Sequence, residues 1–282
     1  MKSKPGQGAS GAPDLIRHHY DVETELAAKL RNASKDERRA GLYASIYRER
    51  LERIPSHPLL LRAHDETATA HAVEAQLGLL EKWLRPDMDF LEVGPGDCTL
   101  AVAVASSVRN VYAVDVTDAL LDDAEYPPNF RFIASDGVTV SVPEGTIHLA
   151  YSNQVLEHLH PDDARDQLVA IWKALAPGGR FICITPNRLS GPWDISRQFD
   201  DVARGLHLRE YTLSELVDLL RSVGFEVHLF ASYKGRHIAT VVPERPVRVF
   251  ESAIGRLPRD IRRRLAWPLT AVKVLATRPE SG

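Results

Sequence analysis

The sequence predicts an α/β fold in which a doubly wound, mostly parallel sheet of seven strands is covered by helices on both faces. Two observations support this. Strand and helix patterns alternate from Met88 onward, and the apolar strand 88–93 leads through a Gly-Pro-Gly turn at 94–96 into a helical pattern. With 282 residues, 44% of them hydrophobic, the chain can bury one large core and a smaller accessory layer.

The region before the sheet is predicted to be helical. Residues 1–13 are rich in glycine and proline and indicate a disordered tail, and residues 14–84 form a helical cap region. Apolar residues recur there at spacings of three and four over 43–54 and 73–84, which indicates two amphipathic helices separated by a break at 55–58. We expect these helices either to pack simply against the sheet domain or to form a lid over a substrate, because accessory elements often border the cleft at the strand ends.

Residues 85–282 form the sheet domain. Strands are predicted at 88–93, 111–115, 130–134, 147–152, 179–185, 225–232 and 271–277. A helix over 162–176 begins at Pro161 and stops at the Pro-Gly-Gly turn 177–179. A second helix over 212–223 opens with the capping box Thr212-x-x-Glu215 and ends at Gly224.

The turn at 94–96 predicts a nucleotide-binding loop. Its glycines let the backbone turn tightly and approach a ligand, and the helix that follows presents unpaired N–H groups. Asp115 closes the next strand 19 residues after Gly96, where its carboxylate can accept hydrogen bonds from the hydroxyls of a ribose. The two segments together predict a cofactor that contains adenosine. The loop alone is shared with nicotinamide dehydrogenases, but Thr99 stands where their fingerprint has a third glycine.

Further motifs follow in order: 131–137, the segment 147–159 with Glu157-His158-Leu159, and the segment 175–187 with its Pro-Gly-Gly turn. This ordered series resembles the class I S-adenosylmethionine-dependent methyltransferases over roughly residues 84–280. The resemblance implies the strand order 3-2-1-4-5-7-6 with the last strand antiparallel. It also implies that residues 233–270 are an insertion between the last two strands.

The resemblance implies that S-adenosyl-L-methionine is the cofactor and assigns its binding residues. The turn lies against the methionine part, Glu92 reaches the ammonium group, and Asp115 takes the ribose hydroxyls. The adenine is flanked by Val116 and bonded by Asp136 and Gly137, and Asn153 lies where the methyl group points. The residues assigned to cofactor binding are thus Glu92, Gly94, Pro95, Gly96, Asp115, Val116, Asp136, Gly137 and Asn153.

The implied reaction is in-line transfer of a methyl group to an oxygen, or with less support a nitrogen or carbon, of a small molecule or a glycan or lipid-linked precursor. A hydroxyl acceptor needs a base, and His207 and His158 are the candidates. The loop 186–211 that contains His207 also holds Arg188, Trp193, Arg197 and Arg209, which suit an anionic or carbohydrate acceptor. Two alternatives stay open: a protein that binds the cofactor without transferring the methyl group, and an NAD-dependent dehydrogenase.

Composition limits the partners and the setting. A net charge of −3 gives no global case for nucleic acid, and the sequence predicts no metal site. Two cysteines and no apolar run of about 18 residues favour a cytoplasmic protein without disulfides or membrane spans. The segment 243–265 contains seven arginines against three acids, interleaved with apolar residues, which is compatible with weak contact to an anionic membrane. The oligomeric state is not predicted.

Overall fold

A computed structural model describes residues 12–55, 57, 66–121, 125–233, 236–266 and 270–280. Of the tail predicted over 1–13, residues 1–11 lie outside the described residues, and the first helix already begins at Ala12. Within the described ranges, no helix combines the length and apolarity that a membrane crossing requires.

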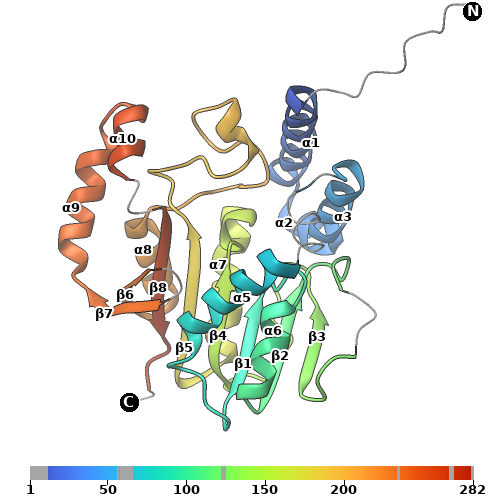
Figure 1. Cartoon of the computed structure of the whole chain (residues 1–282), viewed down its shortest axis with the longest axis vertical. Helices are drawn as coiled ribbons and strands as arrows, with labels where there is room; N and C mark the ends of the chain where they lie inside the picture. Colours follow the sequence, from blue (N-terminus) through green and yellow to red (C-terminus); the bar gives the residue numbers. More distant parts are fainter. Residues whose placement is uncertain are drawn as a thin grey trace, which may run out of the picture.

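The centre of the molecule is one mixed sheet with the order β3-β2-β1-β4-β5-β8-β6-β7 (Figure 1). Strands β1 to β5 are parallel, and β8 is antiparallel to β5 and to β6. The strands are β1 Asp89–Val93, β2 Asn110–Asp115, β3 Phe130–Ala134, β4 Ile147–Asn153, β5 Leu175–Pro186, β6 Glu226–Tyr233, β7 Arg236–Val242 and β8 Ala271–Thr277. All seven predicted strands are therefore present, and their predicted order and the antiparallel last strand are confirmed.

The sheet departs from the prediction in having an eighth strand. β7 pairs with β6 alone, in an antiparallel hairpin at the edge of the sheet. The predicted insertion 233–270 therefore extends the sheet by one strand before it forms the helices α9 Glu244–Gly255 and α10 Arg259–Leu265. Figure 1 shows these two helices at the β7 edge, on the opposite side of the sheet from β3.

A second correction concerns the Pro-Gly-Gly segment, which lies inside β5 rather than before it. β5 begins at Leu175, and its register against β4 shifts between Ile147 and Leu149. Gly179 is needed at this irregularity, because a Cβ there would lie 2.7 Å from the carbonyl oxygen of Ala176 and 2.9 Å from that of Ile147.

Helices cover both faces of the sheet, as the alternation of patterns predicts. α7 Pro161–Ala174 and α8 Leu213–Val223 bury their apolar sides in one core cluster, and α6 Thr99–Val104 belongs to the other. Strand β1 feeds both clusters because alternate side chains point to opposite faces: Leu91 and Val93 belong to the first and Phe90 to the second. The predicted Thr212–Glu215 capping box is present at the start of α8.

The N-terminal region contains more helix than the two predicted stretches. Its helical elements are α1 Ala12–Asn32, α2 Lys35–Glu37, the π-helical turn η1 Arg38–Leu42, α3 Tyr43–Arg53 and α5 Glu66–Leu80. α5 packs against α6 and contributes Leu80 to the second core cluster, so it belongs to a covering layer of the sheet. The first helices instead lie above the carboxyl end of the sheet (Figure 1).

Asp163, at the start of α7, is hydrogen-bonded to both η1 and α3. Its fully buried carboxylate accepts a hydrogen bond from Arg38 at 2.5 Å, from Tyr43 at 2.9 Å and from Arg39 at 3.0 Å. These charged contacts fix η1 and α3 beside the carboxyl ends of the strands, where parallel sheets bind their ligands.

Candidate functional site

A cavity of about 640 Å³ lies at the carboxyl ends of β1, β2 and β4, beneath α1 and α3. Its wall contains every residue assigned to cofactor binding except Asp136, and it contains both candidate bases. The lining falls into two groups of mutually contacting residues. One surrounds the glycine turn, and the other joins α1 and α3 to the loops that follow β4 and β5.

The turn after β1 is shaped by its two glycines. Gly94 has a φ of +68° and Gly96 a φ of +60°, a conformation that side chains with a Cβ rarely adopt. A Cβ on Gly94 would also collide with the side chain of Val155. The turn therefore offers bare backbone to the cavity, with Pro95 between the two glycines.

Asp115 ends β2 and faces this turn. Its carboxylate accepts hydrogen bonds from the N–H groups of Gly96 at 3.2 Å, Val116 at 2.6 Å and Thr117 at 3.3 Å. Burial raises the pKa of Asp115, and these three hydrogen bonds oppose the rise. The carboxylate thus has a fixed orientation, and a carboxylate with about four acceptor positions retains room for a ligand hydroxyl.

Glu92, one residue before the carboxyl end of β1, is the more unusual acid. It is 5% exposed, and its Oε2 has no hydrogen-bond partner among the described residues. Burial, together with the charges of Asp97 and Asp115, raises the pKa of Glu92 to about 8. A buried acid with an unsatisfied oxygen beside two further carboxylates favours a cationic ligand group at this point.

Asp136 lies in the turn that follows β3. Its carboxylate accepts hydrogen bonds from the N–H of Val138 at 2.8 Å and of Thr139 at 2.6 Å, so it closes its own turn. It does not line the cavity, whereas Gly137 does. The Gly137 N–H is already donated to the Ser135 hydroxyl at 3.1 Å.

Asn153 ends β4 and lies at the cavity wall. Its side-chain amide donates to Gln76 of α5, which also accepts a hydrogen bond from Tyr151. Gln76 was not identified from the sequence, because it lies among the apolar residues of a helix far from any motif.

The two candidate bases are adjacent but differ in their electrostatics. The rings of His158 and His207 meet edge to face with their centroids 4.9 Å apart. His158 Nδ1 donates to the carbonyl of Leu206 at 2.9 Å. Burial lowers the pKa of His158 well below the usual range, assisted by the charges of His207 and Arg50. His158 is therefore a neutral imidazole with an unprotonated Nε2.

His207 is 7% exposed and its Nδ1 contacts Glu210 Oε1 at 2.8 Å. Burial alone would lower the pKa of His207, but the hydrogen bond to Glu210 and the charges of Glu157 and Asp194 outweigh it, so the pKa is raised. The carboxylate fixes the proton on Nδ1 and leaves Nε2 as the nitrogen that accepts a proton.

Several polar groups of the cavity were missed from the sequence. Tyr47 and Arg50 lie one turn apart on α3, and Asp194 lies in the loop after β5. Tyr47 Oη, Arg50 Nε and Asp194 Oδ2 are buried and have no hydrogen-bond partner among the described residues. The apolar residues that recur over 43–54 predicted only an amphipathic helix, and their spacing did not indicate a binding surface.

Of the loop residues predicted to contact the methyl acceptor, the arginines 188 and 209 lie away from the cavity and Trp193 lines it. Arg188 and Arg209 form ion pairs with Glu215, at 2.8 and 3.7 Å, and lie outside the cavity. Trp193 does line the cavity, and the guanidinium of Arg197 stacks 4.6 Å from its ring centroid.

Comparisons with known proteins agree with this architecture. The family model described as a methyltransferase domain matches residues 47–229. A probable S-adenosylmethionine-dependent methyltransferase of Mycolicibacterium smegmatis is 28% identical over 177 residues, which cover 61% of this chain and 65% of that protein. A trans-aconitate 2-methyltransferase of Methylobacterium radiotolerans is 34% identical over 103 residues, which cover 36% and 38% of the two chains. The chain thus spans less than two thirds of each of these relatives.

Solved structures show the same fold. The YcgJ protein of Bacillus subtilis matches with a TM-score of 0.50 at 16% identity, over 74% of this chain and all of that one. The phosphoethanolamine N-methyltransferase 2 of Haemonchus contortus matches with a TM-score of 0.52 at 16% identity, over 74% of this chain and 53% of that one. With the family model covering more than half of its residues, the chain belongs to the class I S-adenosylmethionine-dependent methyltransferases.

Proposed function

We propose that this chain transfers a methyl group from S-adenosylmethionine to a hydroxyl oxygen of a small polar molecule, in preference to a nitrogen or carbon. The observation that supports an oxygen acceptor is that His207, which lines the same cavity as the glycine turn, is paired with the buried carboxylate of Glu210. A hydroxyl must lose its proton during methyl transfer, and a histidine oriented by a carboxylate is suited to accept it. A glycan or lipid-linked precursor with such a hydroxyl falls within the same proposal.

The residues of the turn fit the cofactor. The unpartnered Oε2 of Glu92 would accept from its ammonium group, the bare backbone of 94–96 would admit its methionine part, and Asp115 would accept from its ribose. When bound, the cofactor supplies an activated methyl group, so the protein mainly has to align the acceptor with it and exclude water.

The acceptor would be held by the unsatisfied groups of the other half of the cavity. Tyr47 and Arg50 can donate hydrogen bonds to the methyl acceptor, and Asp194 can accept one from it. All three residues line the cavity wall that also contains His207. Because a buried polar group without a partner costs about 1–3 kcal/mol, an acceptor that satisfies these three groups is favoured over an apolar one of equal size. The relative that methylates trans-aconitate, by its name, also acts on a polar small molecule.

Turnover tests this function directly. The protein is incubated with labelled S-adenosylmethionine and a fractionated small-molecule extract, and the labelled product is identified by mass. We expect a product methylated on oxygen. A product methylated on nitrogen or carbon would overturn the oxygen assignment. Cofactor binding without any labelled product would favour the alternative of a protein that binds the cofactor without transferring the methyl group.

Replacing Asp115 by alanine is expected to weaken S-adenosylhomocysteine by about 1–3 kcal/mol, because charge-assisted hydrogen bonds to the ribose would be lost. Titration calorimetry measures the change. Asp118→Ala, at an exposed position in the same loop, is the matched control and should bind as the parent does. Unchanged affinity in a folded Asp115 variant would show that this acid does not hold the ribose.

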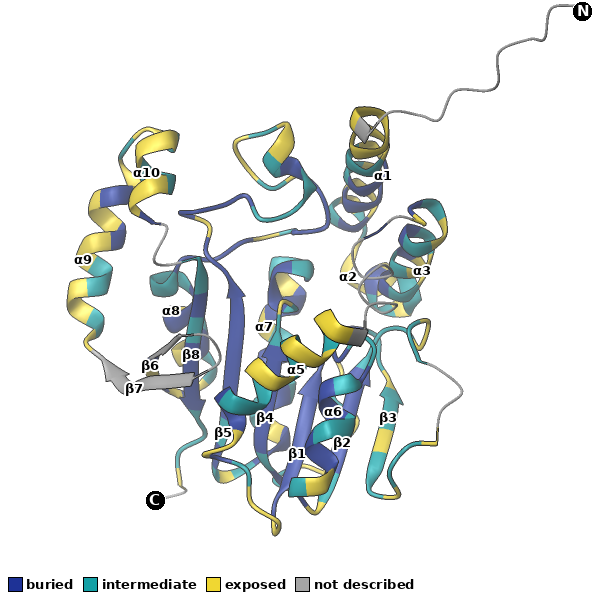
Figure 2. Cartoon of the chain, in the orientation of Figure 1, coloured by how far each residue is buried: buried dark blue, intermediate teal, exposed yellow. Residues whose placement is uncertain are grey.

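We also propose weak contact of the segment 243–265 with an anionic membrane. In Figure 2 most of α9 and α10 is exposed, and Val249, Phe250, Ile261 and Leu265 are large apolar residues on this surface. Not all apolar residues of this segment reach the surface. Ile254 is buried against Leu189 and Ala266, whereas Val249, Phe250, Ile261 and Leu265 are exposed and can enter a lipid surface. Arginines interleaved with exposed apolar groups are typical of interfacial helices.

Vesicles of anionic lipid test the contact. We expect the protein to co-sediment with them at low ionic strength and to dissociate as salt rises, because screening shortens the range of the attraction. The double variant Val249→Ser with Ile261→Ser should bind less without losing stability, since both residues are exposed. Absence of co-sedimentation even at low ionic strength would remove the proposal.

A further inference from the structure

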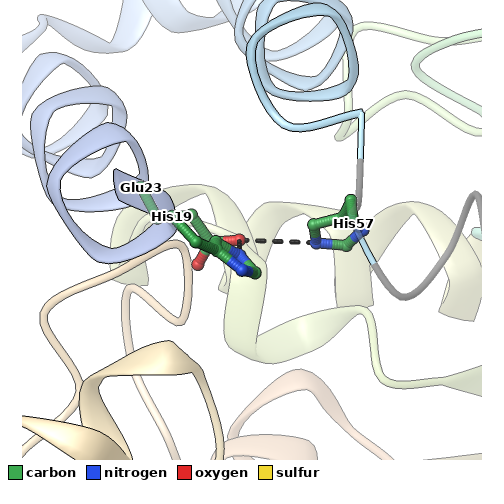
Figure 3. A group of neighbouring side chains, drawn as sticks. All are labelled: His19, Glu23 and His57. Carbon is green, nitrogen blue, oxygen red and sulfur yellow. Dashed lines mark hydrogen bonds and ion pairs between the residues drawn. The ribbon is translucent and has the colours of Figure 1, made fainter. Parts of the chain in front are cut away.

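Two histidines and a glutamate converge at the cavity wall. None of them belongs to the glycine turn or is one of the two candidate bases. His19 and Glu23 lie one turn apart on α1, and His57 follows α3 (Figure 3). The Nε2 atoms of both histidines approach the same oxygen, Glu23 Oε1, at 3.1 Å for His19 and 3.6 Å for His57. The cluster therefore joins two segments that are more than thirty residues apart in sequence.

The spacing of these atoms matches the ligand shell of a metal ion. One ligand atom from each residue can be chosen so that all three lie within 4.8 Å of one another. In a tetrahedral site with bonds of about 2.0–2.1 Å, neighbouring ligand atoms lie about 3.3 Å apart. The two nitrogen–oxygen separations bracket that value, so each imidazole already lies at ligand spacing from the carboxylate.

The surroundings also suit an ion. Glu23 is 4% exposed and His57 is 7% exposed, and all three residues line the cavity. The helix holds His19 and Glu23 on one face, since residues four apart are neighbours there, and this is the spacing that presents two ligands from one helix. Three protein ligands beside a cavity leave a coordination position open to a small molecule.

We propose that His19, Glu23 and His57 bind one divalent transition-metal ion. Two imidazoles and one carboxylate favour Zn²⁺, Fe²⁺ or Co²⁺ over Ca²⁺ and Mg²⁺, which prefer shells made of oxygen atoms. The open position faces the cavity, so the ion would coordinate an oxygen of the molecule that enters it and would lower the pKa of a bound hydroxyl. Arg50 Nη1 lies 3.9 Å from the same oxygen, Glu23 Oε1, so the ion would share this carboxylate with the guanidinium.

The experiment is a titration of the metal-free full-length protein with Co²⁺, followed by visible absorption, and with Zn²⁺, followed by calorimetry. We expect one ion per chain and the absorption bands of nitrogen and oxygen coordination. His57→Gln and Glu23→Gln should each weaken binding by more than about 100-fold, because even the loss of an outer-shell partner costs about 10–100-fold in affinity. Thermal unfolding of the metal-free variants shows whether they are folded, and His19→Gln serves as a second ligand variant if Glu23→Gln is not.

The matched control is His71→Gln, which removes the histidine of an exposed His–Glu pair on α5. It should leave the titration unchanged. The cluster Glu157, His158 and His207 is the other set of suitable spacing among the described residues, so His207→Gln is titrated as well. Loss of binding in that variant instead of His57→Gln would move the site. Absence of a stoichiometric ion in the parent protein would show that the three residues form only a hydrogen-bonded cluster.

Discussion

Glutamine in place of His207 is expected to lower kcat by about 10²–10⁴-fold, which is the usual contribution of a positioned base. The affinity for S-adenosylhomocysteine should change little, because His207 contacts Glu210 and His158 rather than the glycine turn. Methyl transfer to the identified acceptor is the measurement. His228→Gln, at an exposed position on β6, is the control and should retain full activity. Equal kcat in parent and His207 variant would exclude a role for this residue as the base.

The pH profile distinguishes a base from a structural histidine. The pKa of His207 is raised above 6.5, and a base acts only when deprotonated, so the rate should rise with pH through that raised value and then level off. Glu210→Gln removes the carboxylate that favours the imidazolium, so the inflection should move to lower pH. If His207 has only a structural role, Glu210→Gln should leave the inflection of the rate profile at the pH found for the parent protein.

Glutamine in place of Glu92 is expected to weaken S-adenosylmethionine by about 2–5 kcal/mol, since one partner of a buried ion pair would be lost. The pKa of about 8 has a further consequence. At pH 7 the free protein holds a protonated Glu92, and an ammonium group beside it would favour the carboxylate. Binding should therefore release close to one proton, which calorimetry detects as a dependence of the binding enthalpy on the buffer.

The Glu92→Gln variant should release no proton when it binds S-adenosylmethionine. The pH dependence of the free energy of unfolding provides the control, and the raised pKa of Glu92 sets its direction. Because folding raises the pKa of Glu92 from 4.5 to about 8, the folded state binds more protons between these values, and its stability falls as pH rises through that window. Glu92→Gln lacks this loss, so at pH 8 the free variant should be at least as stable as the parent. Proton release that persists in the variant would contradict the assignment of Glu92.

The sheet could be predicted from sequence because its strands are continuous apolar runs separated by turns. β7 could not, since an edge strand that pairs on one side only is defined by its partner β6 rather than by its own periodicity. The Pro-Gly-Gly segment was predicted as a turn because both residue types favour turns, whereas the structure accommodates it as an irregularity within β5.

The two halves of the cavity also differ in how far they could be predicted from the sequence. The glycine turn and Asp115 are local features, 19 residues apart, with a spacing that follows from one strand, one helix and the next strand. The other half brings His19, Glu23 and Arg50 against loops that follow β4 and β5. Its contacts, such as the ring pair of Tyr47 and His158, join residues more than a hundred positions apart. A single sequence carries no pattern for such contacts, so the histidines and carboxylates of α1 were not recognised.

Calorimetric titration of the parent protein with S-adenosylhomocysteine and with NAD addresses the central claim that the glycine turn, Glu92 and Asp115 hold an adenosyl amino acid. We expect one molecule of S-adenosylhomocysteine per chain and no heat from NAD. Binding of NAD with no binding of S-adenosylhomocysteine would contradict the account and would restore the dehydrogenase alternative.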